Sequence, residues 1–331
     1  MVFLLFFICA VVTVITAIKL STYADVLSEK SALGGMLVGT VLLAGATSLP
    51  EVTTSVSAIV LNNPDIAIGN VLGSNMFNIL IIACFDLYYR KQQFFNGAAK
   101  EHIYTATVGF LLAVTAFSAL IVQINIEIFH IGLDTLTILL IYIVGMFIIA
   151  KITKYENSVK PIPPKEEEEK QNTNAISLKR AIIGFVIAAI VILAAGSLLT
   201  ITGDRIAVIT GLGSSFVGSF LIAATTSLPE AVSVLIAIQL RNYNLAIGSI
   251  LGSNLFNMII LAGTDVIYRP GAILSYVAPV HLITATAISV LSIILLYSIG
   301  RKTSRSSFTY MLPSILLVVV YFISSYLIFI Q

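Results

Sequence analysis

Thr-Ser-Leu-Pro-Glu stands at residues 47–51 of this chain, and the same five residues stand again at 226–230. Both copies belong to longer matching stretches, because residues 38–90 align with residues 217–269 without a gap. The offset is a constant 179 residues, and about half of the aligned positions are identical. Such self-similarity is the signature of an internal repeat. We therefore expect two structurally related halves, each carrying one copy of the motif.

The composition around the repeats is that of a membrane protein. Hydrophobic residues make up 58% of the 331 residues and charged residues only 10%, whereas about a quarter of a soluble domain is charged. The apolar residues fall in runs of about 17 to 30, enough to cross a hydrocarbon core roughly 30 Å thick. A net charge of +2 gives no reason to expect nucleic acid as a partner. Cys9 and Cys84 lie in apolar runs, where we interpret them as packing residues.

The apolar runs predict an all-α integral membrane protein with ten transmembrane helices. These are expected near residues 2–18, 31–60, 66–89, 102–122, 130–152, 180–200, 208–240, 244–267, 280–300 and 310–330. The predicted organisation is a first five-helix repeat over 1–154, a solvated linker rich in proline and glutamate over 155–178, and a second five-helix repeat over 179–331. The first helix has no basic region before it and no small-residue cleavage site after it, so we expect it to be retained.

The positions of lysine and arginine predict the orientation, because basic residues accumulate in cytoplasmic loops. With the N-terminus outside, sixteen of the 18 basic residues fall on the cytoplasmic side, and only Arg205 and Arg269 remain outside. The expected protein therefore lies in the cytoplasmic membrane with both termini outside and the linker in the cytoplasm. Since each half has an odd number of helices, the second half enters from the opposite side, which makes the repeats inverted.

Each motif places a glutamate inside an apolar helix, where an ionised carboxylate costs at least about 2.5 to 3.5 kcal/mol at the bilayer centre. The preceding proline, Pro50 or Pro229, has no N–H and collides with the carbonyl four residues back, so the helix must kink or break. Freed carbonyls and neighbouring hydroxyls would then surround Glu51 and Glu230 with oxygen atoms. A packing kink is the alternative interpretation of the prolines. An intramembrane carboxylate beside unwound backbone is, however, typical of cation sites in transporters.

A second repeated block, Gly-Ser-Asn-x-Phe-Asn, follows each motif on the next predicted helix. Within it, Ser74 and Asn78 are four residues apart and share a helical face, as do Ser253 and Asn257. The glycines also permit close helix packing, so a purely structural role is an alternative. The two motifs together supply oxygen ligands only, which suit hard cations such as Ca2+. Two glutamates would neutralise one divalent ion.

Other polar residues of the helices receive structural interpretations. We assign Asn75 and Asn254 to helix packing. The three histidines lie near predicted helix ends and are interpreted as interfacial residues. Two aspartates are expected to form i,i+4 ion pairs at helix ends, Asp86 with Arg90 and Asp265 with Arg269.

On these motifs the chain resembles the cation/Ca2+ exchanger superfamily, and within it the prokaryotic Na+/Ca2+ exchangers. The resemblance covers essentially the whole chain and is carried most specifically by the two Thr-Ser-Leu-Pro-Glu motifs. The proton-coupled branch typically has Gly-Asn-x-x-Glu at this position, so the form found here favours Na+ coupling. The resemblance implies four ion sites between the second, third, seventh and eighth helices. It also implies alternating access as the first and sixth helices slide across the other eight.

The resemblance further implies the ligands by motif position. Ca2+ would be bound by Glu51, Glu230 and the backbone of Thr47 and Thr226. Na+ would be bound by Ser48, Ser227, the carbonyls of Ala44 and Ala223, Ser74, Ser253, Asn78 and Asn257. Asn257 departs from the pattern, because many relatives have aspartate there, and this weakens the case for K+ dependence.

The expected function is that of a secondary active antiporter, not an enzyme, which exchanges Na+ for Ca2+ and normally exports Ca2+. We expect a functional monomer without a cofactor, whose partners are the two ions and the lipid bilayer. Exchange of Ca2+ or another divalent cation for H+ is the alternative. A cation channel or a transport-inactive membrane protein is a third interpretation.

Overall fold

The computed structural model describes residues 1–30, 45–159, 176–301 and 307–331. Within these ranges the chain is almost entirely helical, and its only strands form a short hairpin of β1 (Glu127–Ile128) and β2 (Ile131–Gly132). In the described part of the chain, eight helices are long and apolar enough to cross a membrane. They are α1 (Val2–Lys30), α4 (Pro64–Tyr88), α5 (Glu101–Val122), α6 (Leu133–Val159), α7 (Leu178–Thr210), α11 (Tyr243–Ile267), α12 (His281–Gly300) and α13 (Ser307–Phe329).

The two remaining predicted spans contain the repeated motifs, and both are broken. In the second half, α8 (Ser214–Phe216), the π-helix η3 (Val217–Ile222) and α9 (Ala223–Thr226) lead into α10 (Leu228–Gln239) with a bend of 41°. In the first half, α3 (Leu49–Val60) is the counterpart of α10, while residues 31–44 of the predicted span lie outside the described ranges. The all-helical membrane fold of two inverted five-helix repeats is confirmed.

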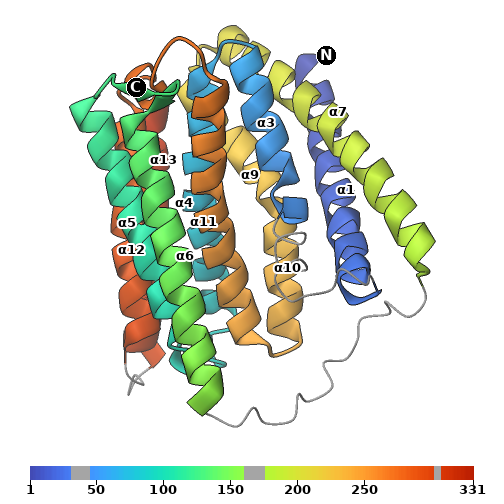
Figure 1. Cartoon of the computed structure of the whole chain (residues 1–331), viewed down its shortest axis with the longest axis vertical. Coiled ribbons are helices and arrows are strands. Elements are labelled where there is room, and N and C mark those ends of the chain that lie inside the picture. The colour runs from blue at the N-terminus through green and yellow to red at the C-terminus, as the bar shows by residue number, and fades with distance from the viewer. Residues whose placement is uncertain (31–44, 160–175, 302–306) are drawn as a thin grey trace.

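Figure 1 shows the inversion directly. The first and last helices, α1 and α13, place the two chain ends on one face, which we call the terminal face. The end of α6 and the start of α7 lie on the opposite face, which we call the linker face. Each half therefore crosses the molecule an odd number of times, and the second half runs in the opposite sense from the first.

Helix α4 lies at the centre of the molecule. In its apolar window 94% of the residues are buried inside the protein, against 17% for α1 and for α6. It contacts α3, α11, α12, α13 and η3, and the close approach to η3 is possible because Gly73 has no side chain. A Cβ at Gly73 would lie 2.3 Å from the Ser219 carbonyl oxygen. The poorly buried helices α1 and α6 lie at the outside of the bundle.

Helices α1 and α7 pack along each other at one edge of the bundle (Figure 1). Both are longer than expected, because the prediction ended them at residues 18 and 200, where the apolar runs stop. The helices continue through residues 19–30 and 201–210, which contain charged residues but no proline. Helix α7 ends only at Gly211, whose φ of +72° is a left-handed conformation that favours glycine. Two single-turn helices, η1 (Phe94–Gly97) and η4 (Ile273–Ser275), cap the ends of the bundle.

Candidate ion-binding site

The two Thr-Ser-Leu-Pro-Glu motifs form the breaks that begin α3 and α10. Ser48 and Ser227 stand at the breaks, and in each helix the proline is the second residue, where its missing N–H has no partner to lose. The glutamate follows as the third residue. Glu51 and Glu230 are therefore each held in the first turn of a helix, close to the positive end of the helix dipole.

Both glutamates are buried, and they face each other across the two halves. Each is only 2% exposed. The Thr226 side chain neighbours the Glu51 carboxylate, and Glu51 lies close enough to Glu230 for the two carboxyl groups to interact. Glu230 in turn interacts with the side chain of Ser253. The inverted repeat thus brings the two motif carboxylates to one place.

Helices α4 and α11 supply the second layer of oxygen atoms. Ser74, Asn78, Ser253 and Asn257 are all buried. The Ser74 hydroxyl lies 3.4 Å from that of Thr226, so the first-half helix α4 touches the second-half motif directly. The ligand role of these four residues stays a prediction.

Five oxygen atoms in this region are buried and have no hydrogen-bond partner among the described residues. They are Glu51 Oε2, Glu230 Oε2, Ser227 Oγ, Asn78 Oδ1 and Asn257 Oδ1. Burying unpaired polar oxygens is unfavourable, and buried charges in proteins are usually paired or coordinate a cation. Carboxylate, hydroxyl and amide oxygens are the ligands of hard cations such as Ca2+, so the residues present fit a Ca2+ substrate.

The remaining predicted ligands lie at or near the two helix breaks, except for Ala44. Ser48 and Ala223 are buried at the two breaks, and the Ala223 carbonyl accepts hydrogen bonds from the Ser227 N–H and the Thr226 hydroxyl. Thr47 lies in the helical turn before Ser48. Ala44 lies outside the described residues.

Asn70 is a residue of this region that sequence reasoning missed. It is fully buried on α4, and its amide nitrogen donates to Thr54 Oγ1 at 2.7 Å and Ser55 Oγ at 2.9 Å on α3. Its amide oxygen accepts from the Thr226 hydroxyl at 3.2 Å. Asn70 therefore joins α3, α4 and the second-half motif. The aligned position of the second repeat is Ser249, so comparison of the repeats does not reveal it.

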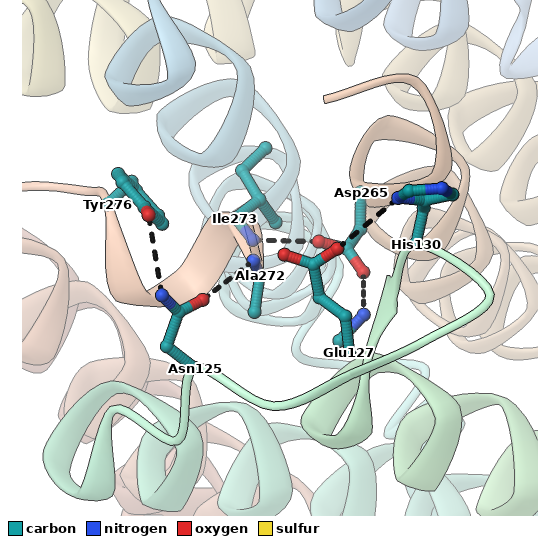
Figure 2. A network of polar contacts seen from close by, with 8 residues as sticks. Asn125, Glu127, His130, Asp265, Ala272, Ile273 and Tyr276 are labelled. Carbon is teal, nitrogen blue, oxygen red and sulfur yellow. Dashed lines mark hydrogen bonds and ion pairs between the residues drawn. The ribbon is translucent and has the colours of Figure 1, made fainter. Parts of the chain in front are cut away.

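The expected ion pairs of Asp86 and Asp265 with arginines four residues later are wrong. Asp86 is fully buried and accepts hydrogen bonds from the hydroxyls of Tyr310 and Ser314. Asp265 accepts from the backbone N–H groups of Gly132 and Ile273, both at 2.7 Å (Figure 2). Each aspartate anchors neighbouring elements at one end of the bundle, because buried partners satisfy a carboxylate better than a solvated arginine.

The histidines lie at helix ends, as expected, but two of them are buried. His281 Nε2 is 3.1 Å from Asp65 Oδ1 on the terminal face, and His102 interacts with Asn244 near the other end of the bundle. His130 is exposed and pairs with Glu127 in the β1–β2 hairpin (Figure 2). The three histidines thus make structural contacts away from Glu51 and Glu230.

Fold and site together define a polytopic helical transporter for cations, built from an inverted repeat. The chain belongs to the family described as sodium/calcium exchanger protein, which matches residues 1–153 and 180–330. It is a transporter, not an enzyme, and more narrowly an exchanger-type cation/Ca2+ antiporter.

Known relatives and solved structures agree with this assignment. The chain is 24% identical over 261 residues to the inner membrane protein YrbG of Escherichia coli K12, covering 78% of each. It is 27% identical over 246 residues to the putative antiporter CaxA of Alkalimonas amylolytica, covering 72% of each. Its fold is similar to that of the sodium-calcium exchanger NCX_Mj, with a TM-score of 0.58 and 20% identity over 98% of both chains. It is also similar to that of the H+/Ca2+ exchanger CAX, with a TM-score of 0.68 and 12% identity over 99% of this chain and 86% of the other.

Proposed function

We propose that the protein exchanges Na+ for Ca2+ across the cytoplasmic membrane by alternating access and normally exports Ca2+. The observation that carries the proposal is the set of buried oxygens without partners around Glu51 and Glu230. Two carboxylates neutralise one Ca2+, and the same carboxylates, shared with neutral oxygens, provide places for Na+. Ca2+ and Na+ then compete for one region, which is the requirement for exchange.

The neutral oxygens favour Na+ over H+ as the coupling ion. A proton needs only a carboxylate oxygen, whereas Na+ needs several oxygen ligands. Ser227 Oγ, Asn78 Oδ1 and Asn257 Oδ1 are buried oxygens beyond the two carboxylates that have no other partner among the described residues. They support Na+ sites flanking the glutamates, in the positions that the family motifs imply. A proton would need none of these three groups as a ligand.

Exchange of Ca2+ for H+ is the second candidate. The fold is closer in TM-score to the H+/Ca2+ exchanger CAX than to NCX_Mj, and two buried carboxylates can carry protons as well as cations. The TM-score compares only the backbone fold, whereas the neutral oxygens are the groups that would contact the coupling ion. We therefore rank Na+ coupling first.

The transport step we propose is movement of the α1 and α7 pair across the remaining helices. On the terminal face, Asn63 Nδ2 donates to Asp204 Oδ1 of α7 at 2.7 Å and to Ser214 Oγ at 2.9 Å. The bond to Asp204 ties α7 to the start of α4 and must break if α7 slides, whereas the bond to Ser214 joins the start of α4 to α8. With the terminal face outside the cell, as the basic residues predict, the bond to Asp204 holds α7 at the external side of the site.

The ligands we propose are those of the family motifs. Ca2+ is bound by Glu51, Glu230 and the backbone of Thr47 and Thr226. Net inward charge would help drive Ca2+ export, since a membrane potential supplies about 2.3 kcal/mol per charge per 100 mV. The transporting unit is a monomer with repeats at 1–154 and 179–331.

The test is 45Ca2+ uptake into proteoliposomes that contain the purified full-length protein. Vesicles loaded with Na+ and diluted into Na+-free buffer should accumulate Ca2+, and an imposed pH gradient without Na+ should not drive uptake. Uptake that follows the pH gradient and ignores Na+ would establish the second candidate. Ca2+ flux with no counter-ion at all would indicate a channel.

A further inference from the structure

Two pairs of asparagines join α4 to α11 in a symmetric arrangement. Asn78 Nδ2 donates to Asn254 Oδ1 at 2.9 Å, and Asn257 Nδ2 donates to Asn75 Oδ1, also at 2.9 Å. Asn75 and Asn254 occupy the same position in the two repeats, as do Asn78 and Asn257. In both pairs, therefore, the first asparagine of one repeat accepts from the second asparagine of the other.

A backbone group fixes the direction of the first pair. Asn254 Nδ2 donates to the Asn75 carbonyl oxygen at 3.4 Å, and a carbonyl can only accept a hydrogen bond. The Oδ1 of Asn254 must therefore point toward Asn78, and Asn78 must donate its Nδ2–H to that oxygen. The Asn78 Oδ1 is left buried and without a partner among the described residues, on the helix face that carries Ser74.

The second pair has the same outcome. Asn257 is 1% exposed, its Nδ2 is used by Asn75, and its Oδ1 is without a partner in the described part of the chain. It lies one helical turn from Ser253, which contacts Glu230. Reversal of either amide would present an NH2 group to a cation, which is electrostatically unfavourable. The accepting asparagines thus decide which atom of each ligand amide is available.

The accepting asparagines also line a small cavity on the far side of α4 and α11. The cavity has a volume of about 20 Å3, and α5 and α12 complete its wall with Thr105 and Ser292. Asn75 and Asn254 therefore stand between this cavity and the ligand amides. Thr105 donates to the Glu101 carbonyl within its own helix and offers a matched control, because it borders the same space.

We propose that Asn75 and Asn254 are positioning residues that hold the amides of Asn257 and Asn78 with their oxygens directed at Na+. The proposal rests on the proposed Na+/Ca2+ exchange and adds the residues that orient two of its Na+ ligands. Outer residues that orient ion ligands typically change ion affinity by about 10-fold to 100-fold when they are lost. Ca2+ is held mainly by Glu51 and Glu230, so its own affinity should change much less.

The experiment is equilibrium binding of 45Ca2+ to the purified full-length protein, first without Na+ and then with increasing NaCl. In Asn75→Leu and Asn254→Leu the Na+ concentration that displaces half of the Ca2+ should rise by about 10-fold. The Ca2+ affinity measured without Na+ should stay within about threefold of the wild-type value. Thr105→Val, which alters the cavity but neither amide pair, should leave both quantities unchanged.

Two results overturn the inference, and they are distinguishable. If Na+ displaces Ca2+ from the wild-type protein and the two leucine variants respond identically, the positioning role is wrong while exchange stands. If Na+ does not displace Ca2+ from the wild-type protein, the proposed function fails and the inference fails with it. Should the leucine variants not fold, Asn75→Ala and Asn254→Ala remove the same acceptors without added apolar volume and carry the test.

Discussion

Glu51 and Glu230 are the residues on which the proposed ion site should depend most. Removing one partner of a buried ionic contact costs about 3 to 5 kcal/mol, and each 1.4 kcal/mol is tenfold in affinity. We therefore expect Glu51→Gln and Glu230→Gln each to lower the initial rate of 45Ca2+ uptake in proteoliposomes by about 100-fold or more. Glu127→Gln is the matched control, because Glu127 lies in the terminal-face hairpin beside His130 (Figure 2). Exchange preserved in both site variants would mean that the site lies elsewhere.

At the residue scale, the sequence predicted the groups that the repeat duplicates. Glu51 and Glu230 could be found because a carboxylate beside proline in an apolar helix needs compensation. The role of Asn70 could not, because its partners on α3 are 15 to 19 residues away, Thr226 is 156 residues away, and only one repeat has asparagine there. Asp86 was assigned to the nearby Arg90, whereas its partners Tyr310 and Ser314 lie 224 and 228 residues away.

Among the elements, α4 and η3 cross in very close contact at Gly73 and Ser219, just before the second-half motif. A Cβ on Gly73 would lie 2.3 to 2.7 Å from three Ser219 backbone atoms, and backbone cannot move aside as a flexible side chain can. We expect Gly73→Ala to destabilise the protein by about 1 to 3 kcal/mol, the usual cost of overpacking. Thermal unfolding in detergent should show a lowered midpoint.

Gly263→Ala provides the comparison for this prediction. Gly263 lies within α11, and no described atom is within 4 Å of the Cβ that alanine would add. Its melting midpoint should equal or exceed that of the wild type, since alanine favours helix more than glycine. Equal losses in the two variants would show that general helix effects, not the contact with Ser219, set the stability at Gly73.

The sequence also predicted where these elements break but not how far they extend. Pro50 and Pro229 mark the starts of α3 and α10 because proline removes a hydrogen-bond donor. The sequence contains no such marker for the true ends of α1 and α7. Both helices continue beyond the hydrophobic runs from which their ends were predicted. The π-helix η3, which packs against α4, was likewise not predicted from the sequence.

At the scale of the whole molecule, inversion brings the two halves of the proposed site together. Hydrogen bonds cross between the halves from Thr226 to Asn70, from Asn78 to Asn254 and from Asn257 to Asn75. The charges of Glu51 and Glu230 also interact across this interface. Neither half alone provides both carboxylates, so Ca2+ binding should be a property of the joined repeats.

The most direct test of this central claim is the stoichiometry of Ca2+ binding to the purified protein in Na+-free solution, measured with 45Ca2+ at constant pH. We expect one high-affinity Ca2+ per wild-type chain. We also expect complete loss of high-affinity binding in Glu51→Gln and in Glu230→Gln separately, because each glutamate serves the same ion. High-affinity Ca2+ binding retained by either single variant would contradict the account.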